Sequence, residues 1–575
     1  MLVAPASRPL LCWTGLVLLL VPGVARAQGF SPEAKRPGDE RIELPELEKA
    51  PKRPEFQLPE APRSEPGELS AAPTIFVQRI EVEGATALGA ERIAALTAPY
   101  LNRTVSAEEI QRLRNELTLA YVNEGYVNSG AVIPGQSIAD GVLRIRIVEG
   151  KLARVDVAEP KWFHADYFRD RLEGAAGRPL DVDALEARLQ QFLLDPRIER
   201  VQAQLEPGDR PGEAVLDTSF EERPPYRLWI GADNHESPSI GAYALRLGFG
   251  HDNLLGRGDR LWAEVGRTKG MESYEAGYEI PVNTADTTLE AYYSWSRSHV
   301  VEKLAVDRNP MFPDVPVHEP NIDSRSQTAA LRLRHPFIRD RSTTLDFTSS
   351  FEWRESRNFF LGLPTSFGEG PERGVSRVTV LRTGLDWVFR DEAQVLAARS
   401  NFSTGLKLLN AAVNEGNSPD GQFLAWLGQL QWLRRYDRLG GIQTLFRTDV
   451  QLSTSALLSL EQFSVGGHAT VRGYRENTLV RDNGLVSSLE LRLPLYADAA
   501  GRSLQLAPFA DIGSSWNTNR DGSVTLYSVG IGLRGQLSEQ LTAEVYWGEG
   551  LRDVSNPEDH DLQDDGVHFR LGWSY

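Results

Sequence analysis

The sequence predicts a transmembrane antiparallel β-barrel of about sixteen strands, preceded by two small α+β modules. The last ten residues, 566–575, alternate apolar and polar side chains and end on an aromatic residue. Segments with the same alternation recur from residue 226 onward, as in outer-membrane barrels, where alternate positions face lipid and a wet lumen. Upstream, one order of elements repeats with a period of about 75 residues. We therefore expect a protein of the bacterial outer membrane.

Residues 1–27 have the features of a removable export signal. Arg8 precedes an apolar run over residues 10–21, and small residues end at Ala27, so cleavage is expected before Gln28. A single-pass anchor is the alternative, but the run is shorter than the roughly 20 residues that span a bilayer. The chain's one cysteine, Cys12, lies inside this segment, so the mature chain cannot form a disulfide. The net charge of -17 argues against nucleic acid as a partner.

Residues 28–73 form a proline-rich segment that we expect to be an extended, mobile linker in the periplasm. Proline lacks the backbone N–H of a helix and favours polyproline-type structure. The nine prolines of this segment are Pro32, Pro37, Pro45, Pro51, Pro54, Pro59, Pro62, Pro66 and Pro73.

Two modules with the order β-α-α-β-β are expected at 74–150 and 151–225. In the first, Ser106 and Glu109 form a capping box before a helix with apolar residues at helical spacing. Its strands and helices are expected at 76–84, about 89–101, from 106 to near 125, 127–134 and 141–149. Those of the second are expected at 152–158, from about 164, 182–194 behind Asp181, 198–205 and 213–221.

The barrel is expected over residues 226–575. An even number of strands returns both barrel ends to the periplasmic side. A soluble β-sandwich also alternates, but it leaves the export signal and the aromatic terminus unexplained. The expected strands are 227–234, 243–251, 259–268, 273–282, 288–298, 327–338, 343–355, 376–390, 396–409, 422–436, 443–454, 486–496, 504–516, 525–537, 540–551 and 566–575.

The sixth external connection, between the eleventh and twelfth strands, carries the most distinctive motif. Val471, Arg472, Gly473 and Tyr474 stand in it, and the guanidinium of Arg472 suits a carboxylate. On the thirteenth strand, Leu504, Leu506, Ala510, Ile512 and Trp516 have lipid-facing parity. Phe509, Asp511 and Gly513 are therefore expected to face the lumen, where an acidic side chain needs a partner or water.

These two motifs together resemble the signature loop and following strand of the two-partner secretion transporters (TpsB) and their barrel-assembly relatives. The phrases at 125–127, 140–150 and 252–259 are typical of the TpsB branch, and the modules resemble polypeptide-transport-associated (POTRA) domains. The resemblance covers residues 74–575. It implies an outer-membrane pore that passes a large, unfolded partner exoprotein of adhesin or haemolysin type from periplasm to cell surface, with activation of this cargo as a further option. It also implies that the sixth loop is folded into the lumen and that Arg472 contacts Asp511.

Two features bear on how closely the chain follows that family. Relatives often carry a helix that plugs the pore before the first POTRA domain, whereas the prolines of 28–73 disfavour one here. Trp573 and Tyr575 should form the aromatic insertion signal, with tyrosine where phenylalanine is commoner. We expect the barrel-assembly machinery and outer-membrane lipid as partners during biogenesis.

No enzymatic motif is found, and no cofactor or metal is expected. The chain lacks a phosphate loop, His-Glu-x-x-His and Gly-x-Ser-x-Gly. His468 is interpreted as a loop histidine. The acidic run 553–565 is interpreted as a solvated external loop, with a divalent-cation site as the alternative.

Two other functions remain as alternatives to secretion. One is a factor that inserts other barrels into the membrane, which shares the fold and the Arg472 loop. The other is a passive porin or receptor, for which the two modules have no evident use.

Overall fold

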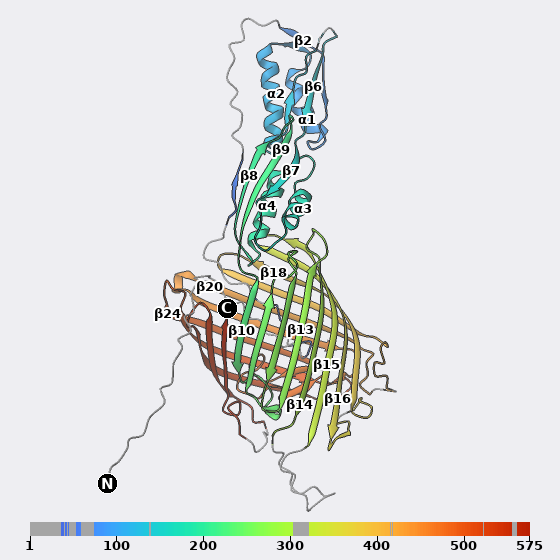
Figure 1. Cartoon of the computed structure of the whole chain (residues 1–575), viewed down its shortest axis with the longest axis vertical. Helices are drawn as coiled ribbons and strands as arrows, with labels where there is room; N and C mark the ends of the chain where they lie inside the picture. Colours follow the sequence, from blue (N-terminus) through green and yellow to red (C-terminus); the bar gives the residue numbers. More distant parts are fainter. Residues whose placement is uncertain are drawn as a thin grey trace, which may run out of the picture.

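A barrel carries two α+β units stacked at one end in the computed structural model of the chain (Figure 1). The described residues are 36–38, 41–42, 44, 53–58, 74–136, 138, 140–302, 321–367, 369–414, 416, 418–520, 522–554 and 560–575. The expected export signal lies outside them. Among the helices of these ranges, none combines the length and apolarity needed to cross a membrane.

The first unit packs two helices against a three-stranded sheet of order β3-β6-β5. The predicted capping box opens α2, because Glu109 N donates to Ser106 Oγ and Ser106 N donates to the Glu109 carboxylate. Leu113, Leu117 and Tyr121 of α2 are fully buried in its core. Its elements are β2 (Ile75–Val77), β3 (Arg79–Glu83), α1 (Ala90–Thr97), η1 (Ala98–Tyr100), β4 (Arg103–Val105), α2 (Ala107–Val122), β5 (Gly130–Val132) and β6 (Val142–Val148).

The second unit has the sheet order β1-β8-β9-β7. As predicted, Asp181 caps α4 by accepting a hydrogen bond from Ala184 N. Phe168, Leu185 and Leu189 are fully buried in its core. Its elements are β7 (Lys151–Val157), α3 (Ala165–Ala175), α4 (Val182–Leu193), β8 (Ile198–Pro207) and β9 (Glu213–Glu222).

The remaining strand of that sheet, β1 (Glu55–Gln57), comes from the proline-rich segment. It pairs in parallel with β8, opposite Gln202–Gln204, and Phe56 packs against the core of the second unit. Further upstream, Arg41 is bonded to Asp449 inside the barrel. The prediction of a wholly periplasmic, mobile linker is therefore wrong for these residues. An open sheet edge and an inward carboxylate each bind part of the segment.

The barrel contains sixteen full strands and the two-residue strand β17, and it confirms the predicted fold class. It closes where β10 pairs antiparallel with β28, from Trp229 opposite Ser574 to Asp233 opposite Arg570. The strands are β10 (Tyr226–Asp233), β11 (Ala244–His251), β12 (Arg260–Arg267), β13 (Met271–Pro281), β14 (Thr288–His299), β15 (Ile322–Arg339), β16 (Thr343–Phe360), β17 (Leu363–Pro364), β18 (Val375–Arg390), β19 (Gln394–Gly405), β20 (Leu424–Tyr436), β21 (Ile442–Ser453), β24 (Asn483–Ala497), β25 (Ser503–Trp516), β26 (Ser523–Gln536), β27 (Leu541–Gly550) and β28 (Val567–Ser574).

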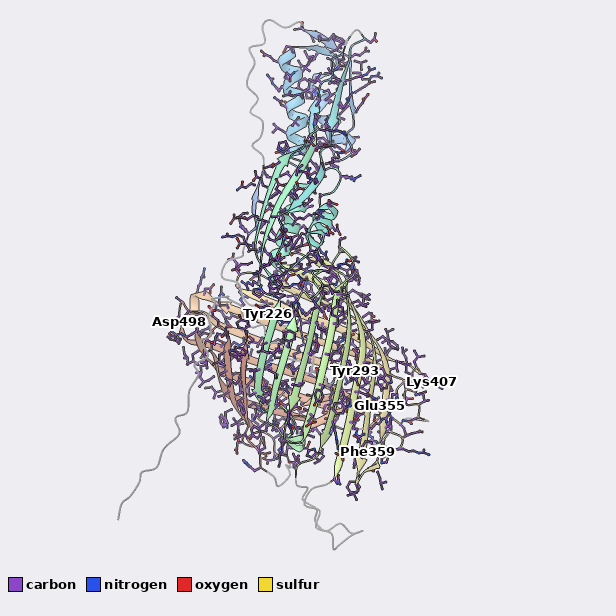
Figure 2. The ribbon with its side chains drawn as sticks, viewed as in Figure 1. Tyr226, Tyr293, Glu355, Phe359, Lys407 and Asp498 are labelled. Carbon is purple, nitrogen blue, oxygen red and sulfur yellow. The ribbon has the colours of Figure 1, made fainter. Side chains whose placement is uncertain are left out.

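The predicted parity of the thirteenth barrel strand, β25, is present in the structure. Ala510 and Ile512 are exposed on the outer surface, while Phe509, Asp511 and Gly513 are buried on the inner one. Figure 2 places Tyr226 and Asp498 at the barrel end beside the second unit and Phe359 toward the other end. Long connections therefore lie at the end away from the α+β units.

Candidate functional site

The connection from β21 to β24 folds back into the barrel. It contains the small hairpin β22 (Phe463–Val465) and β23 (Leu479–Arg481), whose pairing sequence analysis missed. Phe463, Val465, Val471 and Tyr474 are buried in one apolar cluster with Val486 of β24 and Leu526 of β26. Apolar packing against the inner wall thus holds this sixth loop inside the lumen.

Arg472 is one of the most deeply buried charged groups of the loop, with a side chain 2% exposed. Its Nε donates to Asp511 Oδ2 at 2.8 Å and its Nη2 to Asp511 Oδ1 at 2.9 Å, which is a bidentate pair. Its backbone N donates to the same carboxylate at 3.1 Å. The structure therefore brings together the two residues that the resemblance connects.

Two further wall residues complete the binding of this guanidinium. Nη1 donates to Glu490 Oε2 at 2.6 Å, and Nη2 donates to Ser488 Oγ at 3.1 Å. The Phe509 ring lies 3.6 Å from Arg472 Cζ, in cation–π contact. Sequence analysis did not assign Glu490 or Ser488 a role. The sequence feature that could have identified them is the alternation of β24, which turns both side chains inward. The pairing of β24 with β25 then places Ser488 opposite Asp511 and Glu490 opposite Phe509.

The glycines of both motifs permit close approach of the loop to the wall. Gly473 has φ +91°, and a Cβ there would lie 2.8 Å from Gly548 O. A Cβ on Gly513 would lie 2.4 Å from Val465 Cγ1 and 2.7 Å from Val471 Cγ2. A side chain at either position would therefore push the loop away from β25 or β27.

Tyr474 fastens the loop through its hydroxyl. Tyr474 Oη lies 3.1 Å from Tyr527 O and accepts a hydrogen bond from Arg552 N at 3.0 Å. The ring is 6% exposed. Val471, Arg472, Gly473 and Tyr474 thus each contact the wall or its connections.

The proline-rich segment contributes a second element to the lumen. Arg41 Nε donates to Asp449 Oδ2 at 2.8 Å, and Gln431 Nε2 donates to Ile42 O at 2.6 Å. A cavity of about 480 Å³ remains beside Arg41 and Ile42, lined by residues of β13 to β16, β18 and β19. The lumen is therefore partly filled by this segment and by the sixth loop.

Two predicted loop features have more contacts than expected. The His468 ring stacks on His235 with centroids 3.9 Å apart, and its Nε2 lies 3.9 Å from Glu544 Oε1. In the acidic run, Asp564 forms a buried ion pair with Arg475, so the interpretation as a solvated loop is wrong for that residue. Within the described ranges, no group of three or more His, Cys, Asp or Glu side chains is arranged to hold a metal ion.

Besides the bonds from Arg197 Nη1 to Asp252 O at 2.6 Å and to Gly258 O at 2.9 Å, the second α+β unit is fixed to the near rim of the barrel through Asp286. This residue, in the turn between β13 and β14, accepts hydrogen bonds from Arg171 Nε at 2.9 Å and Arg188 Nη1 at 3.0 Å. Arg339 of β15 donates to it at 3.3 Å. Burial alone raises the pKa of Asp286, but the three guanidinium groups outweigh it and hold that pKa below its usual value.

The C-terminal strand presents its aromatic side chains outward. Leu571 and Tyr575 are about half exposed on the lipid-facing surface, and Trp573 shares their parity. Tyr575 N donates to Leu228 O at 2.8 Å, so the terminus is tied to β10 at the closure of the barrel.

Comparisons with known proteins agree with this arrangement. A family model described as haemolysin secretion/activation protein ShlB/FhaC/HecB matches residues 212–535, and a ShlB-type POTRA domain model matches residues 75–150. Outer membrane transporter CdiB of Escherichia coli O6:K15:H31 (strain 536 / UPEC) is 25% identical over 507 residues, covering 84% of this chain and 80% of that protein. Hemolysin transporter protein ShlB of Serratia marcescens is 22% identical over 510 residues, covering 85% of each.

A solved structure shares the fold along almost the whole chain. That of CdiB from Escherichia coli has a TM-score of 0.67 and 23% sequence identity, and the match covers 89% of this chain and 92% of that one. The residues matched by the family model, 212–535, make up more than half of the chain and include Arg472 and Asp511. The chain therefore belongs to the ShlB/FhaC/HecB family of haemolysin secretion/activation proteins, the outer-membrane transporters of two-partner secretion.

Proposed function

We propose that this protein takes an unfolded, haemolysin-type partner exoprotein from the periplasm and passes it through its lumen to the cell surface. The observation that carries the proposal is the sixth loop, which is held in the lumen by apolar packing and by side-chain hydrogen bonds with the wall. The strand pairing that closes the barrel does not include the hairpin β22–β23 of this loop. A loop held in this way can leave the path of a polypeptide while the barrel stays closed.

We assign both α+β units, 74–150 and 151–225, as periplasmic POTRA domains. Both contain the order β-α-α-β-β, with β2 and β4 additional in the first, although the POTRA domain model matches only residues 75–150. Their position at one end of the barrel supports a role at the entrance of the lumen (Figure 1).

Capture is assigned to the edge strand β5 of the first unit. In the second unit, β1 already covers the edge at β8. By contrast β5 is the end strand of its sheet, and Val132 on β5 and Leu119 on α2 are about half exposed. An extended polypeptide can add to such an edge through main-chain hydrogen bonds, with little demand on its sequence.

We assign Arg472 and Asp511 as the lock of the sixth loop, supported by Phe509 and by Gly513. Trp573 and Tyr575 are assigned as the insertion signal that the barrel-assembly machinery recognises before the barrel enters the lipid. Their outward direction and their place at the barrel closure support this role.

The test compares the secreted proteins of wild-type cells and of cells that lack this gene. We expect one large exoprotein to disappear from the surface and medium and to return when the gene is restored. The quantity of other outer-membrane barrels, measured in the same cells, is the control. A general fall of those barrels would instead support an assembly factor, and an unchanged secreted set would contradict the proposal.

A further inference from the structure

Arg475 lies three residues beyond Arg472 and binds a separate group of carboxylates. Its Nε and Nη2 donate to the two oxygens of Asp564 at 2.5 and 2.6 Å, and its Nη1 donates to Glu302 Oε1 at 2.5 Å. The three side chains are 8%, 11% and 8% exposed. Glu302 follows β14 and Asp564 precedes β28, so both carboxylates stand on connections at the end away from the α+β units.

The residue that follows Arg475 adds a second set of contacts at the same end. Glu476 N donates to Gln563 Oε1 at 2.9 Å. Gln563 is fully buried, and its Nε2 donates to Asn234 O at 2.6 Å and to Glu236 O at 2.8 Å. The Asn234 side chain is in turn bonded to the backbone of Val567 and Phe569. Arg475 and Glu476 therefore connect the sixth loop to the outer ends of β10, β14 and β28.

These contacts differ in kind from those of Arg472. Arg472 binds side chains of the barrel wall on β24 and β25, whereas Asp564 and Glu302, which bind Arg475, lie on connections between strands. Connections change position at lower cost than strands that are hydrogen-bonded on both sides. The loop is thus fixed at two places, once to the rigid wall and once to movable external segments.

We propose that Arg475, Glu302, Asp564 and Gln563 form an outer latch that closes the external end of the lumen. In this proposal, which rests on the proposed transport function, the latch releases when a polypeptide leaves the barrel. Arg475 is a positioning residue, because it acts through the external connections that it holds together. Without its charge, the Glu302 and Asp564 carboxylates lose the cation that they share, and the two connections lose their ion pairs with the sixth loop.

The first test measures ionic current through the full-length mature protein in planar lipid bilayers bathed in KCl. We expect Arg475→Ala to open severalfold more often than the wild type, and Glu302→Gln with Asp564→Asn to behave likewise. Arg520→Ala is the matched control, since Arg520 also lies on an external connection but its ion pair with Glu369 is more than half exposed. Such a pair contributes little to structure, so wild-type currents are expected.

The second test distinguishes release of a latch from damage to the barrel. Glu476→Cys and Gln563→Cys are added to Arg475→Ala and joined by a short thiol-reactive crosslinker that reductant cleaves. The crosslink should return the current to the wild-type level, and reductant should raise it again. A crosslink between Glu369→Cys and Arg520→Cys, made in the same background, should leave the current raised.

Two results would overturn the outer latch. One is wild-type current in both the Arg475→Ala and the Glu302→Gln, Asp564→Asn proteins. The other is a raised current that the crosslink at 476 and 563 does not lower. Both measurements use only salt and lipid, so they are independent of the partner exoprotein. Failure of the proposed function appears separately, as an unchanged secreted set in cells that lack the gene.

Discussion

At the scale of single residues, the lumen holds buried charges in matched groups. Arg472 is bound by Asp511 and Glu490, and Arg492 donates to Glu490 at 2.9 Å. Each charge inside a barrel loses part of its hydration, so each requires a partner or water. Removing one member of such a group leaves the other charges buried without a partner. The free-energy cost of these unpaired charges, rather than the gross attraction of the pair, determines how much a substitution destabilises the group.

We expect Arg472→Ala and Asp511→Ala each to impair secretion, and the double variant to be little worse than either. Both single changes remove the same contact, so their effects should not add. Breaking a well-buried pair costs about 3–5 kcal/mol, and water in the lumen lowers this, so the heat-modifiable barrel should still be inserted. Secretion and protease sensitivity of the sixth loop measure the outcome. Additive losses would show that the two residues act independently.

We expect Asp286→Asn to loosen the second unit on the barrel, because the amide attracts the three guanidinium groups less. The pKa of Asp286 is held below its usual value, so its contribution is present above about pH 4 and is lost as pH falls through the lowered pKa. Spin labels at Glu173 and Arg438 report the distance between the second unit and the barrel. The distribution of this distance should broaden in the variant at pH 7, and in the wild type only in acid.

The control for this prediction is Asp498→Asn. Asp498 also lies on a turn at the near rim, but its ion pair is with Arg502 of the same turn. Its loss should leave the distance between the labels unchanged. Equal broadening in both variants would mean that Asp286 does not seat the second unit.

At the scale of elements, long barrel strands were predictable because one face meets lipid and the other the lumen, which imposes a strict period of two. Short strands were not predictable in this way. β4, β22 and β23 have three residues each, which is too few to show an alternation, and they form only because a partner segment lies beside them. The ninth barrel strand was expected to reach residue 409. It ends at Gly405, and Leu409 and Asn410 adopt positive φ in an external turn.

The candidate site likewise contains some residues that were predictable from the sequence and others that were not. The sequence motifs contain Arg472, Asp511 and the glycines, because these residues meet strict demands of charge and close approach. Glu490, Gln563 and the pair of Arg475 with Asp564 depend on strand register and on the path of external connections. Neither is encoded in local spacing. The parity of β24 marks Glu490 as inward, but only its pairing with β25 places it beside Arg472.

Deletion of residues 75–150 should stop secretion while a heat-modifiable barrel remains in the membrane. The first unit has its own buried core, and barrel closure uses none of its strands. A finer change, Leu119→Lys with Val132→Lys, should weaken secretion by disfavouring an apolar segment at β5. Glu91→Lys on α1, also exposed, is the control. Normal secretion after the deletion would show that the first unit is not the receptor.

At the scale of the whole molecule, the two ends of the barrel carry different parts of the chain. Two units stand at the entrance, the sixth loop and the segment around Arg41 occupy the lumen, and the Arg475 group closes the far side. Arg41 in the lumen and Phe56 on the sheet edge of the second unit are 15 positions apart in the sequence. At about 3.3–3.6 Å per extended residue, that length reaches no more than roughly 50 Å. The same stretch of chain therefore contacts both the entrance and the pore.

This arrangement predicts which residues are accessible from each side of the outer membrane. Asp561 lies on the last connection at the far end, and Glu116 lies on α2 of the first unit. Because Cys12 is the chain's one cysteine and lies in the expected export signal, the mature protein supplies a cysteine-free background. In intact cells a membrane-impermeant maleimide should label Asp561→Cys but not Glu116→Cys. Permeabilising the outer membrane should make the second site react as well, which serves as the control for its reactivity. The opposite pattern in intact cells would place the α+β units at the cell surface, and a capture step at β5 before passage through the barrel would then be impossible.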